Sequence, residues 1–482
     1  MKAQLIGRKW NKGMATLEIL MAFAILILCM SAVILVVFGN QSMAVDSETN
    51  NEAISKAQAL LEEARADSRE DFASVETSSI ENDDIYQKQI IVDPFAATAC
   101  SKQVEAKITW TTEANRPQNI NFFSRVVNIP EALALGGDCP AVPPGPGFTI
   151  GGELNMGSEK TNGLDVFNKK VFIALQDSPG LAFVDVTDYT NPFQIINGYN
   201  VGSEVNDIDV AKDPDTGKVY AYIVKETATN QLQIIDVTDV DNPTFIRNIN
   251  LPEVGGSSEP EGYRVYYYKE RLYVTTKETA GPELHIFDVS DPTANPLPKF
   301  GTKNLNRTVN DIIVTDQNIG GTNYTVAYMA ADSNLKEVGV FDVTTAGVAN
   351  EMYSLNMTGS ADAYSVFFSS VSKLLYIGRQ TNSAEEFFAF DATNSFTALT
   401  EKAKKEVGEN PMGLRIVGTY AYMVTNDSNE DFQTYNADPT TNLSHIRTYN
   451  ASNKGTGIDY EDQFIYETLE QGSVLLQIYY VP

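Results

Sequence analysis

The chain has 482 residues, with 63 acidic against 35 basic side chains and a formal net charge of −28. Nucleic-acid binding depends on a basic face, so this charge argues against a nucleic-acid partner. Hydrophobic residues make up 43% of the chain, which excludes global disorder. Only two histidines are present, which leaves little material for His-based catalysis or a multi-His metal site.

The first forty residues combine a basic segment with an apolar one. Residues 1–13 carry four basic side chains and no acid, and residues 14–38 are mostly apolar. A run of this length suffices to cross a bilayer as a helix, and the basic flank keeps the N-terminus in the cytoplasm. We therefore expect a transmembrane helix over residues 14–38, with the rest of the chain outside the cytoplasm.

One acid, Glu18, interrupts this apolar run. A carboxylate within a membrane is costly and needs a partner. Cleavage after Gly13 would give Met14 a positively charged amino group one helical turn from Glu18. In a helical assembly, Glu18 of one subunit could then pair with the Met14 amine of a neighbour. The alternative is a plain signal anchor that tolerates one acid.

The basic leader, Gly13, Glu18 and the uninterrupted apolar run together resemble the class III signal of type IV prepilins and type II secretion pseudopilins. The resemblance implies cleavage by prepilin peptidase between Gly13 and Met14, followed by N-methylation of the new terminus. It also implies assembly with other pilins through Glu18, with the inner membrane as the site before assembly and an extracellular filament afterwards. The family prefers Phe at the first mature position, and Met14 departs from this preference, as minor subunits do.

Beyond the apolar run, apolar residues recur at three- and four-residue steps as far as Ala64. This periodicity predicts one helix from Met14 to about Asp67. Three strand-like runs follow, at residues 86–92, 104–111 and 121–129. They resemble the small heads of minor pilins, so we expect a small α+β pilin-like domain over residues 39–139.

Three cysteines occur in the chain. Cys29 lies in the apolar run, where it is expected to be an inert apolar residue. Cys100 and Cys139 flank the small predicted sheet in an oxidising setting, so we predict a disulfide between them, with two free thiols as the alternative. Residues 140–147 are rich in Pro and Gly and predict a linker.

One phrase recurs through residues 148–482. Its clearest copies are Leu232-Gln-Ile-Ile-Asp-Val-Thr-Asp and Leu284-His-Ile-Phe-Asp-Val-Ser-Asp. Seven copies advance in steps of roughly 44 to 54 residues, which is the spacing of propeller blades. Two strand-like runs precede each copy, and a further run follows the clearer ones. The sequence therefore predicts a mainly β fold that ends in a seven-bladed β-propeller.

The seventh copy ends with the chain, before any fourth strand. Residues 148–156 are strand-like and precede the first copy. We predict that they complete the seventh blade and so remove an open edge.

The recurring phrase resembles the LVIVD repeat of extracellular prokaryotic proteins, which implies a propeller. Its repeated Asp is expected to end a strand and to bond the backbone of the following turn. Aligning the copies places four further acids near the mouth of a central channel, where propellers often bind ligands: Asp165, Asp209, Asp311 and Asp459.

Signatures of enzymatic activity are lacking. The sequence has no Gly-x-Ser-x-Gly elbow, no His-Glu-x-x-His and no phosphate loop, so we predict no enzyme, no catalytic residue and no cofactor. His285 lies in a repeat strand, where packing or a surface position is expected rather than catalysis. Two acidic loops, at residues 213–217 and 426–430, are candidate calcium sites, but neither has a full calcium-loop signature.

These features predict a minor pilin or pseudopilin that carries a propeller at or near a filament tip. A ring of about 335 residues is roughly 50 Å wide. Closely packed stem helices leave no room for such a head on every subunit, which disfavours a major subunit. The propeller is expected to bind a surface ligand, a polysaccharide or a protein. The alternative is a pseudopilin of a type II secretion-like system that recognises exported substrate.

Overall fold

The structure is a computed structural model. It describes residues 12–97, 100–112, 116–137, 139, 148–157, 159–196, 198–251, 261–347, 349–382, 384–451, 453–472 and 474–480, without the side chains of residues 12–19, 34–46 and 94–97. The chain forms two compact units. One comprises Met1–Ala66, Glu76–Ile91 and Val104–Ser124, and the other comprises Asp67–Val75, Val92–Gln103 and Arg125–Pro482.

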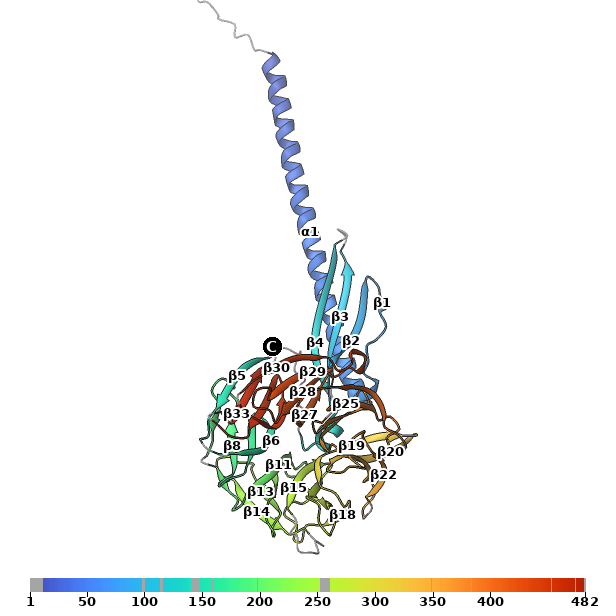
Figure 1. Cartoon of the computed structure of the whole chain (residues 1–482). Coiled ribbons are helices and arrows are strands. Elements are labelled where there is room, and N and C mark those ends of the chain that lie inside the picture. The colour runs from blue at the N-terminus through green and yellow to red at the C-terminus, as the bar shows by residue number, and fades with distance from the viewer. Residues whose placement is uncertain are drawn as a thin grey trace, which may run out of the picture. The chain divides into compact units, whose positions relative to one another are not determined.

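The N-terminal part of the chain is one long helix, α1 (Lys12–Glu70), in blue in Figure 1. It matches the predicted helix and extends three residues further. Near its C-terminal end Ala53, Ala57 and Leu61 are buried, as the three- and four-residue periodicity requires. The hydroxyl of Tyr86 donates a hydrogen bond of 3.0 Å to the carbonyl of Thr49 on this helix.

A four-stranded antiparallel sheet follows, in the order β1-β2-β3-β4. Its strands are β1 (Glu81–Asp83), β2 (Tyr86–Ala97), β3 (Ser101–Thr111) and β4 (Pro117–Val127). Strand β3 alternates, because Val104, Ala106, Ile108 and Trp110 are all buried on one face. A short 3-10 helix, η1 (Phe72–Ser74), lies between α1 and β1.

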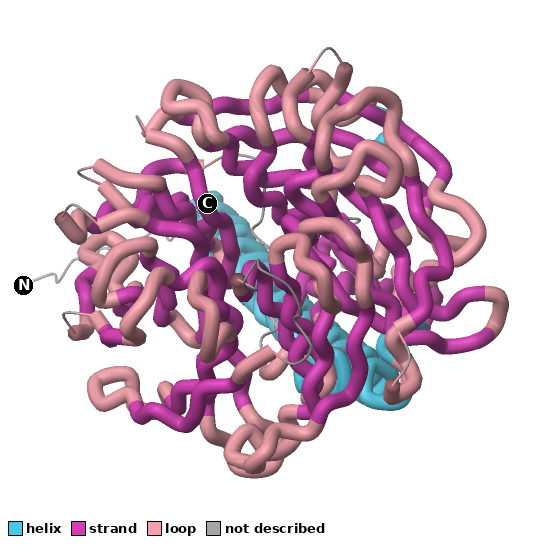
Figure 2. The backbone as a smooth tube through the Cα atoms, turned by 60° about the horizontal axis from the view of Figure 1, so that its bottom comes forward, coloured by secondary structure: helices cyan, strands magenta, loops and turns pink. Residues whose placement is uncertain are grey.

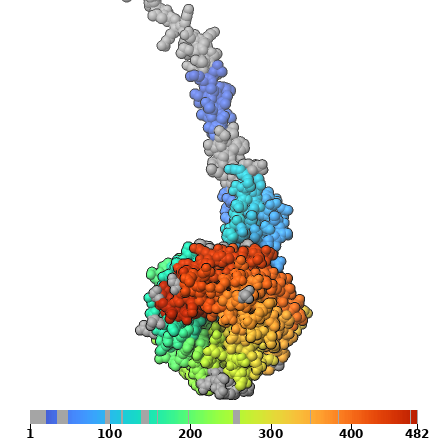
Figure 3. Space-filling model, viewed as in Figure 1, coloured from blue at the N-terminus to red at the C-terminus, as the bar shows by residue number. Residues whose placement is uncertain are grey.

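Apolar side chains of α1 are exposed before this sheet begins. Leu20, Phe23 and Leu28 each keep more than 60% of their surface exposed. In Figure 3 their stretch is the blue part of the helix between two grey parts. Across the described residues, no helix of the structure is long and apolar enough to cross a membrane. Of the predicted span 14–38, the side chains of residues 14–19, which include Met14 and Glu18, and of residues 34–38 lie outside the described ones.

The rest of the chain forms seven antiparallel sheets over the residues that the structure describes, in agreement with the predicted propeller (Figure 1). Sheet one has β6 (Thr161–Phe167), β7 (Lys170–Leu175), β8 (Gly180–Asp185), β9 (Phe193–Gln194) and β10 (Tyr199–Asn200). Sheet two has β11 (Val205–Lys212), β12 (Val219–Lys225), β13 (Leu232–Asp236) and β14 (Thr244–Ile249). Sheet three has β15 (Gly262–Tyr268), β16 (Arg271–Thr276), β17 (Leu284–Asp288) and β18 (Lys299–Lys303).

The remaining sheets keep the same order. Sheet four has β19 (Val309–Ile319), β20 (Thr322–Ala331), β21 (Val338–Asp342) and β22 (Asn350–Leu355). Sheet five has β23 (Ala363–Ser369), β24 (Leu374–Arg379), β25 (Phe387–Asp391) and β26 (Thr400–Lys405). Sheet six has β27 (Pro411–Val417), β28 (Tyr420–Thr425), β29 (Phe432–Asn436) and β30 (His445–Tyr449). The 3-10 helix η2 (Pro439–Thr441) lies between β29 and β30 in the chain. Sheet seven has β31 (Gly455–Glu461), β32 (Phe464–Leu469), β33 (Leu476–Tyr480) and β5 (Thr149–Leu154).

The sheets close into a ring. The first strand of each sheet, hereafter the inner strand, contacts the inner strand of the next sheet, and β31 contacts β6. Figure 2 shows the strands in magenta arranged around this ring. The predicted closure of the last sheet is confirmed, because β5 pairs with β33 in antiparallel register from Thr149–Tyr480 to Leu154–Leu476. Phe148 is buried against Phe432 and Tyr479, with ring centroids 5.0 and 5.1 Å away.

Two repeated side chains hold most of the sheets together. The Asp that ends the third strand accepts the backbone N–H two residues later, as predicted; the distances are 2.8 Å at Asp185 and 3.0 Å at Asp236 and Asp288. A second acid or amide, just before that strand, accepts a backbone N–H beyond the fourth strand. These residues, hereafter the strand-three anchors, are Gln231, Glu283, Glu337, Glu386 and Asp431.

A short helix that the sequence did not predict precedes the ring. Helix α2 (Ile129–Ala134) begins at Asn128, whose side chain accepts the backbone N–H of Glu131. The third strand-like run was expected to reach residue 129, but β4 ends at Val127 because this cap starts a helix instead. The predicted disulfide Cys100–Cys139 is confirmed, with Cα atoms 5.8 Å apart. The predicted linker 140–147 lies outside the described residues.

Candidate functional site in the ring channel

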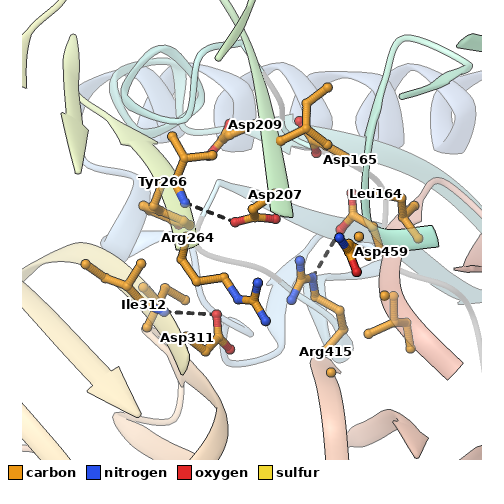
Figure 4. Close-up of a pocket in the computed structure, with 18 of the residues that line it drawn as sticks. Leu164, Asp165, Asp207, Asp209, Arg264, Tyr266, Asp311, Ile312, Arg415 and Asp459 are labelled. Carbon is orange, nitrogen blue, oxygen red and sulfur yellow. Dashed lines mark hydrogen bonds and ion pairs between the residues drawn. The ribbon is translucent and has the colours of Figure 1, made fainter. Parts of the chain in front are cut away.

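A cavity of about 210 Å³ lies at the centre of the ring, between the seven inner strands. Among the described residues that line it, Leu135 is the only one outside those strands. The cavity has room for about seven water molecules at roughly 30 Å³ each. Its lining is polar at the centre, where five carboxylates and two guanidinium groups meet (Figure 4).

The inner strands share one irregularity that positions these groups. Each strand shifts register by one residue against its neighbour near its start, for example between Val205 and Asp207 and between Gly262 and Arg264. The same shift occurs on β6, β19, β23, β27 and β31. A bulge of this kind re-aims the side chains that follow it. The charged residues of the cavity lie just after the bulges.

The carboxylates link neighbouring sheets. An inner strand has no sheet partner on its channel side, so its N–H groups there need other acceptors. Asp207 accepts the N–H of Val265 at 3.0 Å, and Asp209 accepts that of Tyr267 at 2.7 Å. Each of these bonds crosses to the next sheet. In the same way, Asp165 accepts the N–H of Val210, Asp311 accepts that of Val366, and Asp459 accepts that of Val166.

These bonds use one oxygen of each carboxylate. Asp207 and Asp209 each accept through Oδ2. The N–H of Ile208 also interacts with the Asp207 carboxylate, whereas the Oδ1 atom of Asp209 has no hydrogen-bond partner among the described residues. Both residues line the cavity. A Cβ at Gly163 on the neighbouring strand would come within 3.3 Å of Asp207 Oδ1, so a glycine leaves that oxygen room.

The two arginines are also only partly engaged. Arg264 donates through Nε to the carbonyl of Asn310 at 2.7 Å, and Arg415 donates through Nε to Asp459 at 3.1 Å. Each also donates one Nη1 bond to a backbone carbonyl, at 3.1 Å. The Nη2 groups have no partner among the described residues, and Figure 4 shows both guanidinium groups directed into the cavity.

Burial changes how these acids titrate. Loss of hydration raises the pKa of Asp207 to about 6, against the opposing attraction of Arg264. It raises the pKa of Asp209 to about 7, with help from the nearby charges of Asp207 and Asp459. Burial also raises the pKa of Asp311. The centre of the ring therefore takes up protons near neutral pH, where ordinary aspartates do not.

One end of the cavity is partly covered. The carbonyl of Gly136 accepts the N–H of Lys212 at 2.6 Å, and that of Ala134 accepts the N–H of Lys269 at 2.7 Å. Lys212 ends β11 and Lys269 follows β15, so the segment 129–137 covers the C-terminal ends of these inner strands. A Cβ on Gly136 would lie 2.3 Å from that of Ala211, which shows how closely the segment packs.

The acids that the repeat alignment placed at the channel, Asp165, Asp209, Asp311 and Asp459, all line this cavity. The alignment missed Asp207, Arg264 and Arg415. The signal for Asp207 was present, since it lies two residues before Asp209 and both point to the channel side. The arginines stand where other copies have unrelated residues, so repetition gives no signal for them.

In the two candidate calcium loops, the acidic side chains accept hydrogen bonds from the backbone of their own turns. Asp213 Oδ1 accepts the N–H groups of Asp215 and Thr216, and Asp427 Oδ1 accepts that of Asn429. Within the described part of the chain, no group of three acidic, His or Cys side chains is placed to hold a metal. His285 is buried, with its Nε2 2.9 Å from the Pro282 carbonyl, and burial lowers its pKa to about 4. Of the two roles predicted for it, packing or a surface position, its burial shows packing.

Comparison with known proteins gives a likeness of fold only. No family model matches the sequence, and no curated protein matches it. A chain of a mitotic checkpoint complex superposes with a TM-score of 0.51 at 12% identity, covering 69% of this chain and 94% of that one. Raptor from Chaetomium thermophilum gives 0.50 at 11% identity, covering 70% and 29%. The fold over residues 148–480 is thus a β-propeller.

Proposed function

We propose that this chain is a minor pilin or pseudopilin that carries a β-propeller binding or adhesion module at or near the tip of a type IV filament. The observation that carries the proposal is the joining of an exposed apolar helix to a closed ring with a polar central cavity. Such a helix is unstable in water unless lipid or other helices cover it. The ring gives the chain a binding module that the helix alone lacks.

The N-terminal sequence supports the filament part of the proposal. Under this proposal, prepilin peptidase cleaves between Gly13 and Met14, and Glu18 pairs with the Met14 amine of a neighbouring pilin. The chain then passes from the inner membrane to an extracellular filament. The exposed side chains of Leu20, Phe23 and Leu28 would pack against the helices of other subunits.

The filament role is tested with Glu18→Ala in the full-length chain. We expect the variant to be made and folded but to be lost from filaments, because its helix no longer pairs with a neighbouring amino terminus. Glu63→Ala is the matched control, since Glu63 is an exposed acid of the same helix. Filaments are sheared, and the chain is detected in them by immunoblot. Normal incorporation of the Glu18→Ala chain would contradict the proposed pairing.

The tip position is tested by immunogold labelling of the propeller. Label at filament ends or at sparse sites is expected. Regular label along the whole shaft would contradict a minor subunit. If removal of the ring leaves adhesion intact but blocks export of a secreted protein, the chain instead belongs to a type II secretion-like system.

A further inference from the structure

We propose that the ring cavity binds the terminal sugar of a neutral glycan, which enters from the N-terminal ends of the inner strands. This inference rests on the proposed function only in treating the ring as a binding module. It names the ligand class and the direction of entry.

The charges of the lining favour a ligand without net charge. The free Nη2 groups of Arg264 and Arg415 line the same cavity as the carboxylates of Asp207 and Asp209 (Figure 4). A cation placed there meets two guanidinium groups, and an anion meets five carboxylates. The formal net charge of −28 further repels acidic polymers at long range. A ligand with hydroxyl groups can use both sets of partners, because each hydroxyl donates one hydrogen bond and accepts others.

The shape of the cavity favours the end of a chain. The segment 129–137 covers the C-terminal ends of β11 and β15, and Leu135 forms part of the cavity wall there. The lining at the opposite end is Asn162, Asn310, Met412 and Thr456, all at the starts of inner strands. This segment narrows the path of a polymer through the ring, and about 210 Å³ suits one sugar ring. The aromatic rings of Tyr266 and Phe367 in the wall offer apolar surface for the C–H face of such a ring.

The test uses the purified full-length chain in detergent and a series of probes with one ring shape. The probes are the methyl glycosides of glucose, galactose and mannose, with glucuronate as the anionic and glucosamine as the cationic analogue. Binding is measured by calorimetry and by the shift in melting temperature. We expect at least one neutral glycoside to bind in the millimolar range, and its charged analogues to bind about tenfold more weakly or not at all.

Two substitutions locate the site. Asp207→Asn and Asp209→Asn each keep a carbonyl oxygen for the backbone N–H of the next sheet, but turn the second carboxylate oxygen into an amide donor. Each should weaken glycoside binding about tenfold while the ring stays folded. Asp288→Asn is the matched control, because it makes the same change at a turn far from the cavity lining. Equal binding by the folded Asp209→Asn and Asp288→Asn chains would overturn the assignment.

The direction of entry is tested with a longer glycan. A linear oligosaccharide that ends in the bound sugar should bind no more than a few-fold more tightly than the methyl glycoside, and capping its end should abolish binding. Tight binding of the capped chain would overturn the end-binding claim. Stronger binding of a charged analogue, or no binding of any neutral glycoside at its solubility limit, would overturn the ligand class. These assays need no filament, so their failure is distinct from failure of the filament role.

Discussion

At the scale of single residues, the ring is held by acids that accept backbone N–H groups. The repeated Asp at the end of the third strand was predictable, because it recurs in a fixed phrase and turns favour it. The strand-three anchors were not predicted, although each immediately precedes that phrase. The anchors are Gln, Glu or Asp, whose side chains differ in length by one carbon yet reach equivalent N–H groups. Because the residue type changes from copy to copy, the sequence does not reveal the shared role.

One anchor gives a sharp stability test. Glu386 is fully buried and accepts the N–H groups of Val407 at 2.8 Å and Gly408 at 3.1 Å. Glu386→Ala leaves both donors unpaired and should lower the free energy of unfolding by about 2–4 kcal/mol. Glu386→Gln keeps one acceptor oxygen and should lose less. Chemical denaturation measures both, with the exposed Glu401→Ala on β26 as control. Equal loss in the Gln and Ala variants would contradict the anchor role.

The cavity acids predict a dependence of stability on pH. The folded state raises the pKa of Asp209 to about 7, against about 3.9 in an unfolded chain. The folded state therefore binds the proton more tightly, and the free energy of unfolding falls as pH rises from about 4 to about 7.

Asp209→Asn should remove this contribution. The variant should be more stable than the native chain at pH 8, by on the order of 1 kcal/mol once water in the cavity screens the charge, and should lose the advantage at pH 4. Denaturation at both pH values measures the difference. An Asp209→Asn chain that loses stability at pH 8 would show that the carboxylate is ionised and favourably paired.

At the scale of elements, the repeat allowed the order of the strands to be predicted, whereas nothing in the sequence predicted helix α2. The recurring aromatic and apolar runs fix three strands per sheet because these strands are buried on both faces. Helix α2 has six residues, too few to show a helical periodicity. It forms because Asn128 caps it and because the ring accepts its C-terminal end.

The disulfide that flanks this helix can be tested by thiol titration. The native chain should show one reactive thiol, that of Cys29, whereas Cys139→Ser should show two. Loss of the cross-link should lower stability by about 2–4 kcal/mol, because the unfolded chain gains the freedom of the opened loop. Cys29→Ser is the control and should leave stability unchanged. Three reactive thiols in the native chain would contradict the bridge in solution.

At the scale of the whole molecule, the ring depends on a strand from its own beginning. The sequence allowed this closure to be predicted, because the last repeat lacks a fourth strand and residues 148–156 lack a partner. The bulges of the inner strands were not predictable in the same way. They offset the register by one residue, and that offset brings Asp207 and Arg264 to the same cavity as Asp209.

The closing strand offers a matched pair of substitutions. A Cβ at Gly152 on β5 would lie 2.0 Å from the carbonyl of Tyr189, while the neighbouring Glu153 is exposed. Gly152→Ala should lower the free energy of unfolding of the ring by about 1–3 kcal/mol, because the strand must shift against β33. Glu153→Ala should have little effect. Thermal melting compares the two, and equal melting temperatures would argue that β5 contributes little to closure.

The Cys100–Cys139 bridge also decides how the chain carries mechanical tension. When the N-terminal helix is held and the ring is pulled, the force arriving at Cys100 crosses the sulfur atoms to Cys139. Residues 101–138, which include β3, β4 and α2, lie in a closed covalent loop and bear no load. Beyond Cys139 the chain continues to β5, which its pairs with β33 hold in the ring. A chain held at its helix can thus transmit force to its ring without unfolding the segment that partly covers the cavity.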